Sequence, residues 1–406
     1  MTIEDRWLLP DGIEEVLPPA AEALEQVRRQ LLDLYGCWGY ELVVPPFIEF
    51  LDSLLIGTGH DDLDLQTFKI TDQLSGRLMG IRADMTPQVA RIDAHQLRRD
   101  GPVRLCYAGT VLRTRNDGFA GSRSPMQVGV ELYGHRGFES DLEVLSLMLE
   151  TLDQVGLGRI HLDLGHVAIF RYLAAYAGLS REREITLFEA LQRKAVPEIS
   201  QFLADWGLNS AHRTMLGELV HLNGRAEEVL TRADAILAPV GEQVQNALVW
   251  LRHLVAGLSG RYPQVELHVD LAELRGYHYH TGVVYAAYVP THGQAVAQGG
   301  RYDDIGQAFG RARPATGFSA DLKVLQALGG IGLQSPVASG IFAPRSDDPA
   351  LAALIRALRD RQERVICELP GQTATPAQLG CNRHLVSDGE SWHVDRYPSE
   401  QATDEV

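Results

Sequence analysis

Hydrophobic and polar positions alternate along the chain with two periods, and these periods mark out helices and strands. Apolar residues recur at steps of three and four between residues 21 and 35, which predicts a helix that ends at Gly36. The apolar, β-branched run 40–44 predicts a strand, and Pro45 and Pro46 close it because proline cannot donate to a ladder. The chain therefore opens with a helix followed by a strand.

The next segment predicts a long antiparallel hairpin. Residues 103–113 and 126–134 are both extended in pattern, and the polar stretch NDGFAGSRSP joins them. Helical spacing returns over 142–155, and 160–164 alternates between apolar and polar residues like a half-buried strand.

Only helical patterns follow from about residue 180 to residue 255, which predicts a helical insertion without strands. Strand alternation resumes at 265–269 and continues through the extended stretch RGYHYHTGVVYAAYV, and a helix is expected near 319–328. Strands on both sides of the helical block indicate one interrupted sheet. We therefore expect an α+β fold with a mixed, mainly antiparallel sheet flanked by helices.

The last part of the chain predicts a small α/β segment. Its expected elements are a strand at 340–343, a helix at 350–362, a strand at 364–368 and a hairpin around Asp388 and Gly389. We therefore expect a core domain over 1–330, a reduced C-terminal segment over 331–396 and a disordered tail over 397–406.

Composition narrows the classes of function. The chain has 37 Lys and Arg against 53 Asp and Glu, a formal charge of -16, which disfavours a bulk nucleic-acid binder. The four cysteines form no CxxC pair, so no zinc site or disulfide framework is indicated. The N-terminus lacks the apolar core of a signal peptide, and no apolar run is long enough to span a bilayer. We expect a cytoplasmic protein without a metal or cofactor.

The strand QVGVELYG carries the most suggestive chemistry. Period-two geometry places Gln127, Gly129 and Glu131 on one face, which we expect to be polar, with the core on the other face. Glycine between an amide and a carboxylate leaves backbone room for a small ligand, and Glu131 suits an ammonium or imidazole N–H. The competing interpretation is a plain solvent-facing strand.

Two further segments carry polar residues at the same spacing. In RADMTPQ, Asp84 and Thr86 share a face if the segment is extended, although a capped helix start explains them equally well. In RGYHYHTG, Arg275 offers a fixed fork of donors and Tyr279 offers a flat wall and a hydroxyl. The histidines there could chelate a metal, but packed or surface histidines are the more common case. The glycine pair in AQGGRYDD is too weak to indicate a phosphate loop.

In their order and spacing, these segments resemble the core of class II aminoacyl-tRNA synthetases, and among them the histidyl enzymes. WGYELVVPPFIEF is similar to the first class II motif, the hairpin to the second and GGRYDDIGQAFGRARPATGFSADLKVL to the third. RGYHYHTG is similar to a stretch distinctive of histidyl-tRNA synthetases. The resemblance implies a dimer through the first motif. It places a histidine site on Asp84, Thr86, Arg113, Gln127, Glu131, Arg275, Tyr279 and His280.

Other positions depart from the active synthetase pattern. The glutamate that accepts from adenine in that family falls on Arg115, which has only donors. The arginine of the third motif falls on Lys323, which lacks the planar fork. The C-terminal segment is shorter than the family's anticodon-binding domain and has no basic stripe, so we expect no tRNA binding.

This combination resembles the regulatory subunits of ATP phosphoribosyltransferase, which are paralogues of histidyl-tRNA synthetase. The resemblance implies a chain with no catalytic residues of its own. It also implies a short catalytic partner in the first step of histidine biosynthesis, and histidine as effector. The alternatives are an active histidyl-tRNA synthetase and a histidine-binding module with another partner. Glu131 and Arg275 could also pair with each other for stability alone.

Overall fold

The computed structural model describes residues 7–55, 60–116, 121–274, 276–277, 279–330 and 340–397. The chain divides into two compact units, Met1–Ile331 and Gly332–Val406. None of the described helices combines the length and the apolar composition that a membrane span requires.

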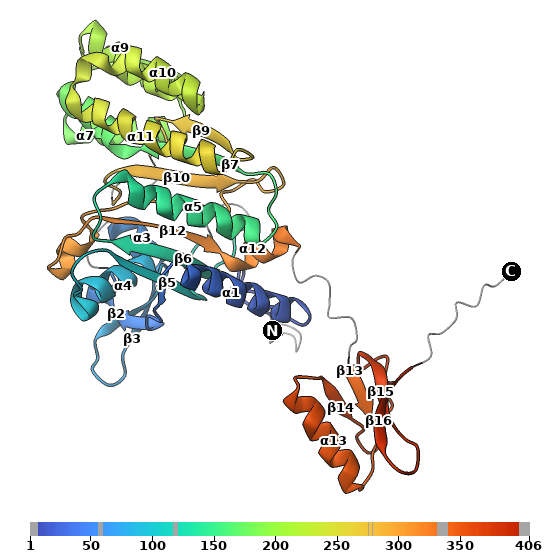
Figure 1. Ribbon diagram of the computed structural model, residues 1–406. Helices are drawn as coiled ribbons and strands as arrows, with labels where there is room; N and C mark the ends of the chain where they lie inside the picture. The colour runs from blue at the N-terminus through green and yellow to red at the C-terminus, as the bar shows by residue number, and fades with distance from the viewer. Residues whose placement is uncertain are drawn as a thin grey trace. The chain divides into compact units, whose positions relative to one another are not determined.

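The described residues of the first unit form a sheet of nine strands in the order β1-β5-β6-β12-β11-β10-β7-β9-β8 (Figure 1). The strands are β1 (Glu41–Leu42), β5 (Val103–Thr110), β6 (Met126–Tyr133), β7 (His161–His166), β8 (Asn223–Arg225), β9 (Glu266–Asp270), β10 (Val283–Tyr288), β11 (Ala297–Arg301) and β12 (Ala315–Asp321). The β1/β5 and β7/β9 pairs are parallel and the other pairs are antiparallel. The predicted mixed, mainly antiparallel sheet is confirmed, as is the long hairpin, formed by β5 and β6.

Helices cover one face of this sheet, and a long helical segment separates β7 from β9 (Figure 1). The covering helices are α1 (Ala20–Cys37), α5 (Phe138–Gln154) and α12 (Leu322–Gly329). The segment contains α6 (Val167–Tyr176), α7 (Arg181–Gln192), α8 (Val196–Asp205), α9 (Ser210–Glu218), η3 (Leu219–His221), α10 (Ala226–Leu237), η4 (Ala238–Val240) and α11 (Glu242–Arg261). Apolar residues of both groups and of the sheet form one continuous core.

A smaller layer lies against the other face of the sheet. It contains the sheet β2-β4-β3 with β2 (Ile48–Phe50), β3 (Phe68–Thr71) and β4 (Leu78–Ile81), and the helices α2 (Leu51–Leu54), α3 (His60–Gln66), α4 (Thr86–Arg91), η2 (Ile92–Leu97) and η5 (Ile305–Phe309). Met85 and Val89 pack there against Leu105 and Tyr107 of β5. This second core positions residues 84–86 beside the sheet.

The second unit has its own core. The described strands β13 (Gly340–Ala343), β14 (Val365–Cys367), β15 (Cys381–Ser387) and β16 (Trp392–Arg396) form a sheet in the order β14-β13-β15-β16, packed with α13 (Pro349–Asp360). Ile341, Leu351, Val365 and Leu385 are buried between them. The strands, helix and hairpin expected after residue 340 are confirmed.

Two local predictions were wrong. The stretch 276–282 is not extended, because Gly276 has a φ of +61° and its carbonyl accepts the N–H groups of Tyr279 and His280, which makes a turn. The helical segment is not free of strands, because β8 pairs with β9 and extends the sheet. Of the two interpretations of RADMTPQ, the structure has the helix start, because Thr86 begins α4.

Candidate functional site

A pocket of about 280 Å³ lies on the face of the sheet that carries Gln127 and Glu131. Seven of the eight predicted site residues line it: Asp84, Thr86, Arg113, Gln127, Glu131, Tyr279 and His280. The eighth, Arg275, lies outside the described residues, and so does its suggested ion pair with Glu131. The fold therefore brings together side chains from three separate segments of the sequence.

Glu131 is the most enclosed acid of the pocket. It stands on β6 with 1% of its surface exposed, so the expected polar face is in fact buried. Its Oε1 accepts hydrogen bonds from Thr86 Oγ1 at 3.0 Å and from the Tyr107 hydroxyl at 3.0 Å. Its Oε2 accepts from the Tyr302 hydroxyl. Three hydroxyl donors thus satisfy a carboxyl group that would otherwise be stranded in the protein interior.

Burial raises the pKa of Glu131 well above its usual range, because the protein interior disfavours the charged form. The hydrogen bonds from Thr86 and Tyr107 oppose this rise, and the nearby carboxylate of Asp84 adds to it. A cationic or N–H-bearing ligand beside Glu131 would favour the ionised form. The group is therefore prepared to respond to a ligand of that kind.

Gln127 and Asp84 fix the segment between β4 and α4 to the sheet. The Gln127 amide donates from Nε2 to Asp84 Oδ1 at 2.8 Å, and its Oε1 accepts from the Met85 backbone N–H at 2.9 Å. Asp84 Oδ1 also accepts the Thr86 N–H at 3.1 Å. This network orients Thr86 toward Glu131, which gives Asp84 and Gln127 a positioning role in the pocket.

Arg113 follows β5 and lines the same pocket. Its Nε donates to the Ala83 carbonyl at 3.4 Å, which holds the guanidinium over the segment that carries Asp84. Among the described lining residues, Asp84, Glu131 and Glu273 supply carboxyl groups and Arg113 supplies the positive charge. Such a mixture suits a small zwitterion that has a cationic part and a carboxylate.

Tyr279 and His280 enter the pocket from the turn that begins at Gly276. Their rings lie close, with centroids 4.1 Å apart, and the His280 ring is 6.3 Å from that of Tyr302. Tyr279 remains 39% exposed while His280 is almost fully buried. Tyr279 therefore lies at the rim of the pocket, and His280 contributes to its wall.

Glycines determine how much space the pocket has. A side chain at Gly317 of β12 would collide with the Glu131 carboxylate, and one at Gly300 of β11 would lie 2.7 Å from His280 Nε2. Gly129, which we expected to leave room for a ligand, leaves room for Tyr107 instead, because a Cβ there would lie 2.6 Å from the tyrosine hydroxyl. That expectation was wrong in its detail.

Sequence reasoning missed the tyrosines that surround Glu131. Tyr107 precedes the predicted site residue Arg113 by six positions. The hairpin register pairs it with Gly129, so it lies on the same face as Glu131. Tyr302 follows the glycine pair of AQGGRYDD, which we had judged uninformative. Gly299 and Gly300 line the pocket beside this tyrosine. Small residues followed by a tyrosine at the end of a strand could have indicated this wall of the pocket.

The chain matches known proteins along most of its length. A family model described as "Histidyl-tRNA synthetase" matches residues 12–325, and one described as "ATP phosphoribosyltransferase subunit HisZ C-terminal domain" matches residues 338–395. The "ATP phosphoribosyltransferase regulatory subunit" of Thioalkalivibrio sulfidiphilus is 61% identical over 97% of this chain and 99% of its own length. The protein of the same name from Alkalilimnicola ehrlichii is 56% identical over 96% and 97%.

The chain belongs to the family of ATP phosphoribosyltransferase regulatory subunits. A Bacillus halodurans structure titled as an ATP phosphoribosyltransferase regulatory subunit/histidyl-tRNA synthetase has a TM-score of 0.79 at 26% identity, covering 91% of this chain and 95% of that chain. A histidyl-tRNA synthetase from Nostoc has a TM-score of 0.75 at 18% identity, covering 94% and 91%, and shares the fold. The class II synthetase-like fold is confirmed.

A second pocket of about 560 Å³ adjoins the first in this regulatory-subunit fold. The two pockets share the lining residues Arg113, Gln127, Gln298 and Ser319. Asp321 lines the second pocket, and burial raises the pKa of its carboxyl group, while its bonds to the N–H groups of Lys323 and Met126 oppose the rise. The pocket continues from Arg113 along β12 and is roomy enough for a larger ligand part.

The two residues that depart from the synthetase pattern are not among the residues that line either pocket, although Lys323 follows the lining residue Asp321 by two positions. Arg115 is exposed. Lys323 pairs with Glu14 at 3.3 Å, which engages its ammonium with the N-terminal segment of the chain. Neither side chain supplies the acceptor or the planar fork that the synthetase chemistry uses at those positions.

Proposed function

We propose that this chain binds free histidine in the 280 Å³ pocket and thereby regulates the catalytic subunit of ATP phosphoribosyltransferase. The observation that carries the proposal is the buried Glu131 carboxyl group, held by three hydroxyls in the same pocket as Arg113. Its relatives are named regulatory subunits of ATP phosphoribosyltransferase, which supports a catalytic subunit of that enzyme as the partner. The resemblance to histidyl-tRNA synthetases supports the ligand.

The pocket offers groups that can bind a histidine N–H and the histidine carboxylate. Glu131 can accept an imidazole or ammonium N–H, and the three hydroxyl groups that donate to it keep its carboxyl group oriented. Arg113 can receive the carboxylate through its fork of donors. Tyr279 can close over the ligand from the rim, where it is partly exposed. The glycines at 300 and 317 keep the space between these groups open.

Regulation requires that histidine binds two states of the complex with different affinities, because a ligand shifts an equilibrium only by that difference. The turn that begins at Gly276 and the segment 84–86 both line the pocket, and neither belongs to the nine-stranded sheet. A ligand that draws them together changes the surface around the pocket. We propose that the catalytic subunit senses this change as feedback by histidine, whereas assembly of the complex activates it without the ligand.

We also propose that the chain has no aminoacylation activity of its own. Arg115 and Lys323 stand where the synthetases use a glutamate and an arginine, and the second unit is small. Pyrophosphate exchange with histidine and ATP measures this directly. Activity of the purified chain alone would contradict the proposal, whereas restoration of phosphoribosyl transfer on mixing with the catalytic subunit would support it.

Calorimetric titration with histidine tests the pocket. The Glu131→Gln substitution keeps the shape but removes the acid, and we expect about 10-fold to 100-fold weaker binding, since a hydrogen bond to a charged group contributes about 1.5–3 kcal/mol. Glu390→Gln, on an exposed loop of the second unit, is the matched control and should bind like the wild type. Equal affinity of all three proteins would place histidine elsewhere.

A further inference from the structure

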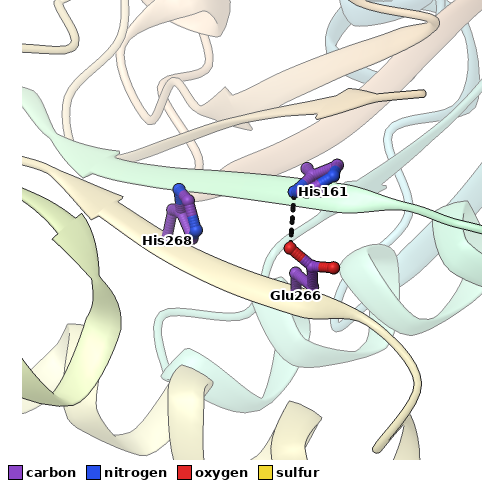
Figure 2. Close-up of side chains that lie close together, drawn as sticks. All are labelled: His161, Glu266 and His268. Atoms are coloured by element: carbon purple, nitrogen blue, oxygen red, sulfur yellow. Dashed lines mark ion pairs between the residues drawn. The ribbon is translucent and has the colours of Figure 1, made fainter. Parts of the chain in front are cut away.

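A group of side chains far in sequence from the pocket segments gathers where β7 and β9 run in parallel. The register places His161 opposite Glu266 and Asp163 opposite His268, so all four side chains project from the same face. The alternate residues Leu162 and Val269 belong to the core. Figure 2 shows His161, Glu266 and His268 directed toward one another from the two strands.

The donor atoms of this group are close enough to share one ion. Atoms that could ligate a metal on His161, Glu266 and His268 all lie within 4.8 Å of one another. Nδ1 of His161 is already 3.0 Å from Glu266 Oε2. Zn²⁺ bonds of about 2.0–2.1 Å at tetrahedral angles separate two ligand atoms by about 3.3 Å, so this pair needs almost no rearrangement.

Exposure and backbone stiffness both favour an ion here. The three side chains are 29%, 41% and 39% exposed, so an ion and its water can reach them without opening the core. The strands are fixed by their neighbours β10 and β8, which leaves only side-chain torsions to adjust. Preorganised ligands on rigid elements lower the entropic cost of binding.

The alternative is a surface network of charges. Arg159 donates to Glu266 Oε1 at 2.7 Å and 3.0 Å, and Arg225 of β8 is opposite His268 in the ladder. Arg159 uses Oε1 and leaves Oε2 to face His161, so the network and a metal can coexist. The positive charges of Arg159 and Arg225 disfavour cations that are held by charge alone. Imidazole nitrogen favours transition metals such as Zn²⁺, Ni²⁺ and Cu²⁺ over Mg²⁺ or Ca²⁺.

We propose that His161, Glu266 and His268 bind a divalent transition-metal ion, with Zn²⁺ as the best match to two imidazoles and one carboxylate. Water completes the coordination, and Asp163 adds a second carboxylate beside His268, 3.9 Å from its Nδ1. The bound ion links the strand that precedes the helices α6–α11 to the strand that follows them. It therefore fastens the base of the helical segment.

Calorimetric titration of Zn²⁺ into the untagged, EDTA-treated full chain tests this site. We expect one strongly bound equivalent in the wild type. His161→Asn combined with His268→Asn should weaken binding by well over about tenfold, the loss that even outer-shell changes can cause. His393→Asn removes an exposed histidine beside Asp388 and is the matched control, because that histidine stands on β16 of the second unit and not on β7 or β9.

Thermal unfolding provides a second measurement on the same proteins. Zn²⁺ should raise the unfolding midpoint of the wild type and of His393→Asn, since binding to the folded state alone stabilises it, and should leave the double variant unchanged. Equal metal-free midpoints would show that the double variant folds; if it does not fold, Glu266→Gln serves in its place. Zn²⁺ binding at wild-type affinity by the double variant, or by Glu266→Gln where that takes its place, would overturn the proposal, and so would absence of binding by the wild type.

Discussion

At the scale of single residues, Glu131 illustrates how a fold maintains a functional group that is unfavourable for stability. A buried carboxyl group is costly unless it is bonded or neutral, and the chain supplies Thr86, Tyr107 and Tyr302 as donors. A fully apolar side chain at this position would pack at lower cost. The acid at this position therefore does not serve stability, which accords with the ligand role proposed for it.

His166 gives a prediction at the same scale. It ends β7, and burial together with the charge of Arg301 lowers its pKa from 6.5 to about 4. Below pH 6.5 the unfolded chain takes up a proton that the folded chain refuses, so stability falls as the pH drops toward 4. We expect the wild type to lose about 2 kcal/mol of unfolding free energy from this group between pH 7.5 and pH 5.

Urea unfolding of His166→Gln at the two pH values measures this loss. The variant should be less sensitive to acid than the wild type by that amount, whereas His393→Gln, at an exposed position, should keep the wild-type pH dependence. Parallel pH profiles for all three proteins would show that His166 titrates normally in the folded chain.

At the scale of elements, a buried ion pair joins α5 to β11. Arg301 Nε lies 3.1 Å from Asp141 Oδ2, both side chains are almost fully buried, and Trp250 of α11 donates to the same oxygen at 2.8 Å. Asp141→Ala would remove the fully buried carboxylate beside Arg301 and leave the partly exposed Asp303 as its carboxylate partner. We expect a loss of about 3–5 kcal/mol in unfolding free energy by urea denaturation.

The exposed pair of Arg193 and Glu198 provides the comparison for this experiment. Glu198→Ala should destabilise the chain far less, because solvent screens the charges of a surface pair. Similar losses for the two substitutions would mean that the Asp141 pair contributes no more than a surface contact.

The segment around β1 and β2 gives a prediction about assembly. Leu42, Val44 and Phe47 are 51%, 83% and 40% exposed, and apolar residues that are exposed together mark interaction surfaces. We propose that they form the self-dimer interface implied by the first class II motif. Light scattering should find a dimer for the wild type and a monomer for Val44→Glu. Leu369→Glu, at an exposed apolar position of the second unit, should remain dimeric, and a dimeric Val44→Glu would refute the assignment.

Strand β6 and the turn at Gly276 show what the sequence could and could not predict. Strict alternation in β6 correctly placed Gln127 and Glu131 on one face, because a strand has only two faces. The turn at Gly276 was missed, since the alternation of RGYHYHTG imitates a strand and a positive φ at glycine leaves no trace in the pattern. The burial of Glu131 was also missed, because the layer that covers it is built from distant segments.

At the scale of the whole molecule, the chain consists of two units with separate cores. The first carries both pockets and the cluster on β7 and β9, and the second matches the C-terminal family model. This division suits a regulatory subunit in which one unit senses a ligand. The formal charge of -16 accords with a protein whose partners are proteins and small molecules.

We propose that the Glu131 pocket is the histidine sensor of the complex. Its most direct test is histidine inhibition of phosphoribosyl transfer by the reconstituted complex of this chain with the catalytic subunit. With Glu131→Gln we expect activation to persist and the inhibitory histidine concentration to rise about 10-fold to 100-fold, in step with the lost hydrogen bond. Unchanged inhibition alongside wild-type activation would show that histidine acts at another site.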